Sequence, residues 1–145
     1  MKENRNEVEI QGSVADVWET LTNFAKYPEW NPLIHHVDGT LEIGEKVVIS
    51  VKKGAEEQKF TCELARLDPP HEFSWKFYEM MPFLYRGEHI FRVEPIDEKT
   101  VRYVNRETFE GLLVPFKKVE TMKSGMVVMD NALKERVEKL QEYGL

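Results

Sequence analysis

The chain has 145 residues, of which 41% are hydrophobic and 32% charged, and this composition predicts a single globular domain over residues 1–145. The formal net charge of −6 argues against nucleic-acid binding, which depends on concentrated Lys and Arg. The sequence has no 18-residue apolar run, residues 1–10 contain no apolar stretch of the kind found in signal peptides, and Cys62 is its single cysteine. We therefore expect a cytoplasmic protein with no integral membrane association.

The first predicted elements are a strand and a short helix. Residues 7–11 alternate polar and apolar, with Val8 and Ile10 on one face, so they predict a half-buried strand. Ser13 can then cap the first turn of a helix. The apolar residues of this helix lie three and four positions apart and form one stripe, made of Val14, Val17, Trp18 and Leu21.

The middle of the chain predicts an antiparallel meander. Pro28 and Pro32 first interrupt the segment FAKYPEWNP, which predicts a compact turn or a broken second helix. Strand-like runs divided by turn signals such as Asp38-Gly39 follow. They predict six strands, over residues 33–37, 46–53, 58–67, 72–79, 84–95 and 100–109.

The last third of the sequence changes to a helical period. Apolar residues recur at steps of three and four, and they are Met122, Met126, Met129, Leu133, Val137 and Leu140. We predict one helix from about Lys117 to Gln141, roughly 37 Å long. A helix of this length can cross a whole curved sheet.

Two segments resemble a known superfamily. The first carries a Val-Trp pair, Val17 and Trp18, followed by the Tyr-Pro-x-Trp-Asn-Pro turn of residues 27–32. The second is ETFEGLLVP, residues 107–115, followed by a helix that carries residues 131–134. Both are similar to the polyketide cyclase/dehydrase-like group of the START and birch-pollen-allergen-like superfamily, abbreviated SRPBCC.

This resemblance implies an α+β helix-grip fold. Such a fold has a curved seven-stranded antiparallel sheet wrapped around a long C-terminal helix, with two short helices between the first two strands. The superfamily includes lipid carriers, hormone receptors, aromatic cyclases and chaperone ATPase activators. The fold alone therefore does not select a function.

Strand alternation predicts which residues face the enclosed space. Three faces are expected to be concave, made of residues 73, 75 and 77, then 85 to 93 and 101 to 109 at every second position. They are mostly apolar with a few polar groups, which is typical of a small-molecule site. With the helix, they give a predicted ligand-binding set of Trp30, Trp75, Phe77, Tyr85, His89, Phe91, Tyr103, Asn105, Glu107, Phe109, Met122, Met126 and Met129.

Each of these residues also has a packing interpretation. Aromatic and Met stripes are ordinary core residues, and Trp30 can be a lid over the cavity or an anchor for the broken helix. The Glu107 carboxyl on an apolar face must be paired, protonated or hydrated, since burying an unpaired charge is costly. An Arg or the His89 imidazole could pair with it. The alternative is that Glu107 or His89 contacts a ligand or transfers a proton.

No metal site or cofactor is expected. His35 and His36 are adjacent and so point to opposite faces of a strand, and no His pair has helical metal-ligand spacing. Cys62 alternates with Phe60 and Leu64 on an apolar face, which predicts a buried, unreactive thiol. The sequence has no glycine-rich phosphate loop.

We expect the chain to bind or transport a small hydrophobic molecule, such as a lipid, a polyketide-like or an aromatic compound. The site would be a cavity between the sheet and the C-terminal helix. An aromatase/cyclase-type enzyme, with Glu107 or His89 as candidate catalytic groups, is one alternative. A protein-interaction module resembling the chaperone ATPase activators is another. The sequence leaves the ligand and the oligomeric state open.

Overall fold

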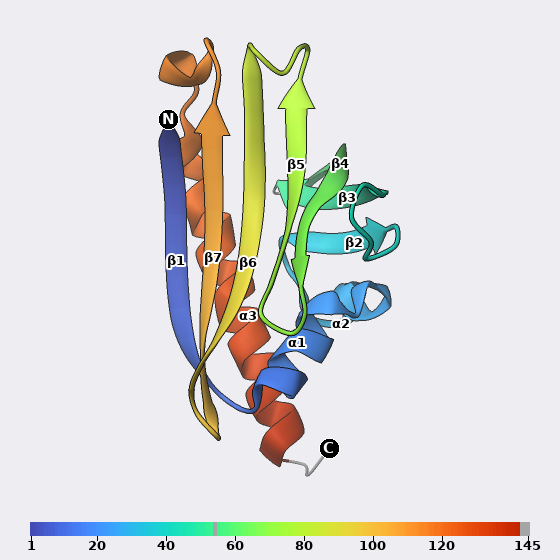
Figure 1. The fold of residues 1–145 in the computed structure, drawn as a ribbon, viewed down its shortest axis with the longest axis vertical. Helices are drawn as coiled ribbons and strands as arrows, with labels where there is room; N and C mark the ends of the chain where they lie inside the picture. Colours follow the sequence, from blue (N-terminus) through green and yellow to red (C-terminus); the bar gives the residue numbers. More distant parts are fainter. Residues whose placement is uncertain (54, 143–145) are drawn as a thin grey trace.

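Seven antiparallel strands form one sheet in the order β1-β7-β6-β5-β4-β3-β2 (Figure 1). The computed structural model describes residues 1–53 and 55–142. The strands are β1 (Lys2–Gln11), β2 (Ile34–Asp38), β3 (Lys46–Lys53), β4 (Glu56–Asp68), β5 (Glu72–Glu79), β6 (Tyr85–Asp97) and β7 (Thr100–Glu110). The predicted meander is confirmed, and β1 joins it by pairing with β7.

The first strand is longer than its sequence pattern indicates. It begins at Lys2 instead of residue 7, and it pairs with β7 over its whole length, from Lys2 opposite Phe109 to Gln11 opposite Thr100. Its first half has no apolar alternation because polar contacts replace apolar ones there. Asn4, for example, is buried and donates a hydrogen bond from Nδ2 to the Val119 carbonyl at 2.7 Å.

Two short helices follow β1, as predicted. Helix α1 (Val14–Thr22) begins at Ser13, whose Oγ accepts a hydrogen bond from the Asp16 N–H at 3.1 Å. A 3-10 turn, η1 (Phe24–Lys26), then leads into the single turn α2 (Tyr27–Trp30). The segment with two prolines is therefore a broken second helix. Asn31 ends it by accepting bonds from the N–H groups of the next two non-proline residues, which leads the chain into β2.

The long helix α3 (Lys123–Glu142) crosses the inner face of the sheet (Figure 1). It begins six residues later than predicted, because the chain first makes two 3-10 turns, η2 (Val114–Phe116) and η3 (Val119–Met122). These turns bury Val114 and Val119 against Tyr85 and Phe109. The predicted apolar stripe is confirmed from Met126 onward, and its fully buried members are Met126, Met129, Leu133 and Val137.

The architecture is the helix-grip fold that the sequence predicted. The core lies between the concave face of the sheet and helices α1 and α3, and every second residue of β6 from Tyr85 to Val93 is buried there. No helix in the described part of the chain is both long and apolar enough to cross a bilayer.

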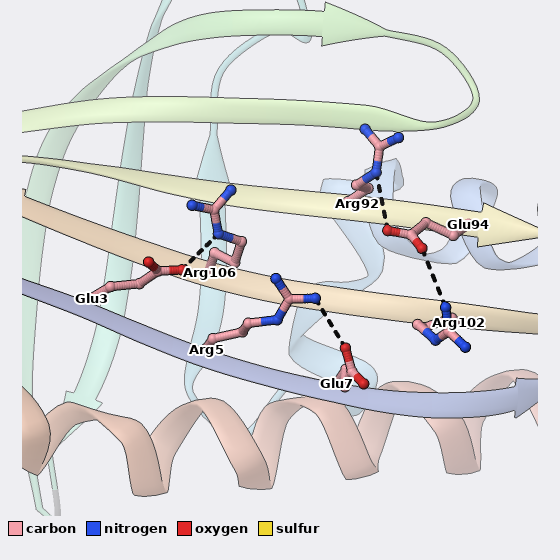
Figure 2. Close-up of polar contacts among 7 residues, drawn as sticks. All are labelled: Glu3, Arg5, Glu7, Arg92, Glu94, Arg102 and Arg106. Atoms are coloured by element: carbon pink, nitrogen blue, oxygen red, sulfur yellow. Dashed lines mark hydrogen bonds and ion pairs between the residues drawn. The ribbon is translucent and has the colours of Figure 1, made fainter.

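The outer face of β1, β6 and β7 carries paired charges. Figure 2 shows these Arg and Glu side chains projecting from the three strands, away from α3. The contacts are Arg106–Glu3 at 2.8 Å, Arg5–Glu7 at 3.1 Å, Arg92–Glu94 at 3.2 Å and Arg102–Glu94 at 3.6 Å. Exposed pairs of this kind contribute less than about 1 kcal/mol each, so this face is a solvated surface with its charges compensated.

Candidate functional site

A cavity of about 900 Å³ lies under the concave face of the sheet, next to the beginning of α3. Its inner wall is mostly apolar, with residues from β2 to β6, and two polar side chains, His89 and Glu107, interrupt that wall. Its rim includes exposed polar residues of β3, β4, β5 and η3, so the cavity opens to solvent. The wall consists of Ile34, Ile49, Val51, Phe60, Cys62, Trp75, Phe77 and Tyr85, and the rim of Leu33, Lys52, Gln58, Lys59, Glu79, Thr121, Met122, Ser124 and Gly125.

Six of the thirteen predicted ligand-binding residues line this cavity. Three of them form one row across the sheet, because Trp75 pairs with His89 and His89 pairs with Glu107 in the strand register. Their side chains lie on the same face for that reason. The other three are Phe77, Tyr85 and Met122.

The other seven predicted residues lie outside the cavity lining. Phe91, Tyr103, Asn105, Phe109, Met126 and Met129 are fully buried in the core. Phe91 stacks on Phe73 with ring centroids 4.7 Å apart, and Phe109 stacks on Tyr85 at 6.1 Å. Trp30 packs edge-on against Tyr27 at 5.2 Å, as an anchor of the broken helix would. Side chains fill this part of the concave face.

The sequence prediction missed all of the wall that β2, β3 and β4 supply. The alternation of Ile49 with Val51, and of Phe60 with Cys62, carries the signal that could have found it. That alternation identifies an inward face. It does not tell which inward faces remain uncovered by a helix.

A chain of buried polar groups runs beside the cavity and connects four elements. His89 Nε2 lies 2.6 Å from Asn105 Oδ1, and Asn105 Nδ2 donates to Asp130 Oδ1 at 2.8 Å. Asn6 Nδ2 donates to the other Asp130 oxygen at 2.7 Å. Because the Asp130 carboxylate can only accept, it fixes the Asn105 amide, so His89 must carry its proton on Nε2. The imidazole Nδ1 is then an acceptor.

Burial shifts the proton affinities of this region. It lowers the pKa of His89 to about 4, against the opposing effect of the Asn105 hydrogen bond, so the imidazole is neutral at pH 7. It raises the pKa of Asp130 to about 6, while the bonds from Asn105 and Asn6 hold it down. The Tyr103 hydroxyl is also buried, has no hydrogen-bond partner among the described residues, and has a pKa raised well above its ordinary value by burial and then by Asp130.

Glu107 is a half-buried ionisable group of the cavity lining. Burial, and then the nearby Asp130 charge, raise the pKa of its carboxyl to about 7. No hydrogen bond or ion pair joins this carboxyl to another residue of the described chain, and the neighbouring Arg106 bonds to Glu3 instead. Of the states that the sequence allowed, the structure therefore favours a carboxyl that is protonated or hydrated over one that is ion-paired with an Arg. Such a group can donate or accept a proton near neutral pH.

The thiol of Cys62 also lines the cavity but is poorly nucleophilic. Burial raises its pKa to about 12, so it stays protonated at pH 7. Among residues 1–53 and 55–142, no three His, Cys, Asp or Glu side chains are grouped as metal ligands. Glu107 and His89 are the two polar side chains of the cavity wall, and both can form hydrogen bonds there.

Solved structures of similar shape span most of this chain. The aromatase/cyclase Zhui from Streptomyces sp. R1128 is 18% identical with a TM-score of 0.77, over 96% of this chain and 94% of that one. The di-domain aromatase/cyclase BexL from the BE-7585A biosynthetic pathway is 18% identical with a TM-score of 0.79, over 97% of this chain and 48% of BexL. This chain therefore spans about half of that protein. Norcoclaurine synthase from Thalictrum flavum is 14% identical with a TM-score of 0.70, over 94% of this chain and 86% of that one.

At these identities the structural likeness concerns the fold. No curated protein matches this chain in sequence. A family model described as polyketide cyclase/dehydrase and lipid transport matches residues 1–143. The SRPBCC resemblance of the sequence is thereby confirmed, and the chain belongs to the polyketide cyclase/dehydrase and lipid transport family.

Proposed function

We propose that this chain binds a small hydrophobic molecule in the 900 Å³ cavity, with the polar end of the ligand at Glu107 and His89. The observation that carries the proposal is the cavity itself: an apolar wall in which one carboxyl has no partner among the described residues. Ligand pockets commonly enclose about 300–1,000 Å³ and combine apolar walls with a few placed polar groups. The volume suits a molecule of two to four fused rings or a medium-length acyl chain.

The two polar groups favour a ligand with a hydroxyl or carbonyl group. Near pH 7 the Glu107 carboxyl exists in both protonation states, so it can donate to a carbonyl or accept from a hydroxyl. His89 uses Nε2 on Asn105 and offers Nδ1 as an acceptor. A purely aliphatic ligand would leave both groups unsatisfied, at a cost of about 1–3 kcal/mol each.

A neutral fluorescent probe tests the proposal. We expect N-phenyl-1-naphthylamine to bind at one site, and 2-naphthol to displace it more effectively than 2-methylnaphthalene. Glu107→Gln should reduce that preference for the hydroxyl compound. Glu110→Gln, which alters an exposed carboxylate paired with Arg86 on the outer face, is the matched control and should leave it unchanged. Absence of probe binding, together with no ligand retained in native mass spectrometry, would refute the proposal.

Catalysis on the bound molecule is a second candidate, favoured by the pKa of Glu107. A general acid or base works best when its pKa lies near the working pH, and this carboxyl meets that condition. Aromatase/cyclases are also among the structures of similar fold. If Glu107 transfers a proton, Glu107→Gln should lower turnover of a converted polyketide-like substrate by about 100-fold or more while probe binding persists. Equal turnover in the two proteins would exclude this role.

A further inference from the structure

The sheet is split between β4 and β5. These strands pair only from Glu63 opposite Lys76 to Asp68 opposite Glu72. Continuing that register would place Cys62 opposite Phe77, but no pairing extends beyond Glu63, and the first half of β4 pairs with β3 alone. In Figure 1 the beginning of β4 turns away from β5 together with β3 and β2. Two strand edges therefore face each other without backbone hydrogen bonds between them.

A second hollow of about 890 Å³ lies at this split and reaches the outer face of the sheet. Five residues line both this hollow and the inner cavity. All of them come from the halves of β4 and β5 that do not pair with each other: Lys59, Phe60, Cys62, Phe77 and Glu79. The two spaces therefore lie on either side of these side chains at the split. The side chains at the junction include two aromatic rings and a thiol, which suit an apolar chain passing between the strands.

The lining of the outer hollow carries four basic and four acidic side chains, but two of the acidic ones are paired with cations from outside the lining. Three of its four Glu side chains are already paired, with Lys117 at 3.3 Å, Arg66 at 2.9 Å and Arg86 at 2.6 Å. They are Glu79, Glu88 and Glu110.

Its three Lys side chains have no ion pair with any described residue, and Glu63 is the one carboxylate left to balance them. These are Lys46, Lys59 and Lys76. The chain as a whole has a net charge of −6, so a group of lysines without ion pairs at the split is a local feature. The neighbouring outer face of β1, β6 and β7 has its charges paired (Figure 2).

We propose that the ligand is an elongated amphiphile with a second, anionic end: its body fills the cavity with a hydroxyl or carbonyl group at Glu107 and His89, its chain passes between β4 and β5, and its anion is held outside by Lys59 and Lys76. The inference rests on the proposed function, since it requires a ligand in the cavity. A negative charge held at the inner wall would lie beside the Glu107 carboxyl, where desolvation and repulsion both disfavour it. The split gives the charged end a route to the exposed lysines.

Two pairs of dansyl probes test this arrangement. The first pair is 11-(dansylamino)undecanoic acid and its methyl ester, whose chain is long enough to pass through the split. The second is dansylglycine and its methyl ester, whose chain is too short. At low ionic strength we expect the long acid to bind about tenfold more tightly than its ester. The short acid should show no such preference.

Charge-reversal variants then locate the anion. Lys59→Glu combined with Lys76→Glu should abolish the preference for the long acid, by weakening the binding of the acid while the ester still binds. Lys26→Glu combined with Lys99→Glu changes the net charge equally at exposed positions away from the split, and it should preserve the preference.

Several results would overturn the inference. Equal binding of the long acid and its ester would contradict the proposal that the ligand has an anionic end. A preference for the acid in the short pair would place the anion at the inner rim of the cavity. Loss of the preference in Lys52→Glu alone, or equally in the control double variant, would also contradict the route through the split. In each of these cases a neutral probe that still binds leaves the proposed function intact. If neither neutral probe nor ester binds, the proposed function itself fails.

Discussion

Replacing Glu107 with Gln is expected to stabilise the protein above neutral pH. The structure holds the pKa of this carboxyl at about 7, against an ordinary value of 4.5. A tenfold change in proton affinity corresponds to about 1.4 kcal/mol, so ionisation of Glu107 costs the folded state up to about 3 kcal/mol. Because the folded pKa is raised, the stability that the protonated carboxyl confers is fully present below pH 4.5 and is lost as the pH rises through 7.

Urea unfolding followed by Trp fluorescence at several pH values measures this effect. The free energy of unfolding of Glu107→Gln, minus that of the wild type, should rise by about 2–3 kcal/mol between about pH 4 and pH 8.5. The change with pH is the diagnostic quantity, because a constant offset reports only how the amide packs. A carboxyl carbon resonance of Glu107 that titrates near pH 7 would support the same conclusion directly.

The matched control is Glu110→Gln in the same strand. Glu110 is exposed on the outer face and lies 2.6 Å from Arg86, so its replacement should change the free energy of unfolding by less than about 1 kcal/mol. A difference between Glu107→Gln and the wild type that stays constant from pH 4 to pH 8.5 would refute the reasoning. It would mean that the Glu107 carboxyl is solvated like an ordinary surface group.

Three further outcomes are expected. Asn105→Ala leaves His89 Nε2 and an Asp130 oxygen without partners, so the free energy of unfolding measured in urea should fall by about 2–4 kcal/mol. A loss below about 0.5 kcal/mol would contradict a stabilising role for these buried hydrogen bonds. Because burial lowers the pKa of His89 to about 4, the stability that depends on its neutral form should be lost as the pH falls from 6.5 through 4, and His89→Phe should flatten that part of the pH profile. Gly87→Ala places a methyl group against the Phe77 ring, so it should cost about 1–3 kcal/mol and weaken N-phenyl-1-naphthylamine binding; an unchanged affinity would show that the ring moves freely.

Local patterns in the sequence predicted most of the fold. The alternation in β5, β6 and β7 identified the concave face, and the period of the last third identified the long helix. These predictions succeeded because side-chain direction depends on backbone period, which a short window of sequence already contains. The Ser13 cap was found for the same reason, since its hydrogen bond reaches only to Asp16.

The late beginning of α3 shows where local patterns stop. Residues 117–122 have good helical spacing, but the chain there forms a 3-10 turn whose Val119 carbonyl bonds to Asn4, 115 positions away. The buried chain from His89 to Asp130 likewise joins groups from β1, β6, β7 and α3. No window of sequence contains both partners of such a contact.

The sequence by itself determined that the sheet has an apolar concave face carrying Glu107 and His89, and that a long helix packs on it. The tertiary structure decided which part of that face stays open. Helices α1 and α3 cover the end that holds Phe91 and Tyr103, whereas the end bounded by β3 and β4 remains a cavity. Periodicity reports the direction of a side chain, but what lies opposite it depends on how far the sheet curves and where two strands part.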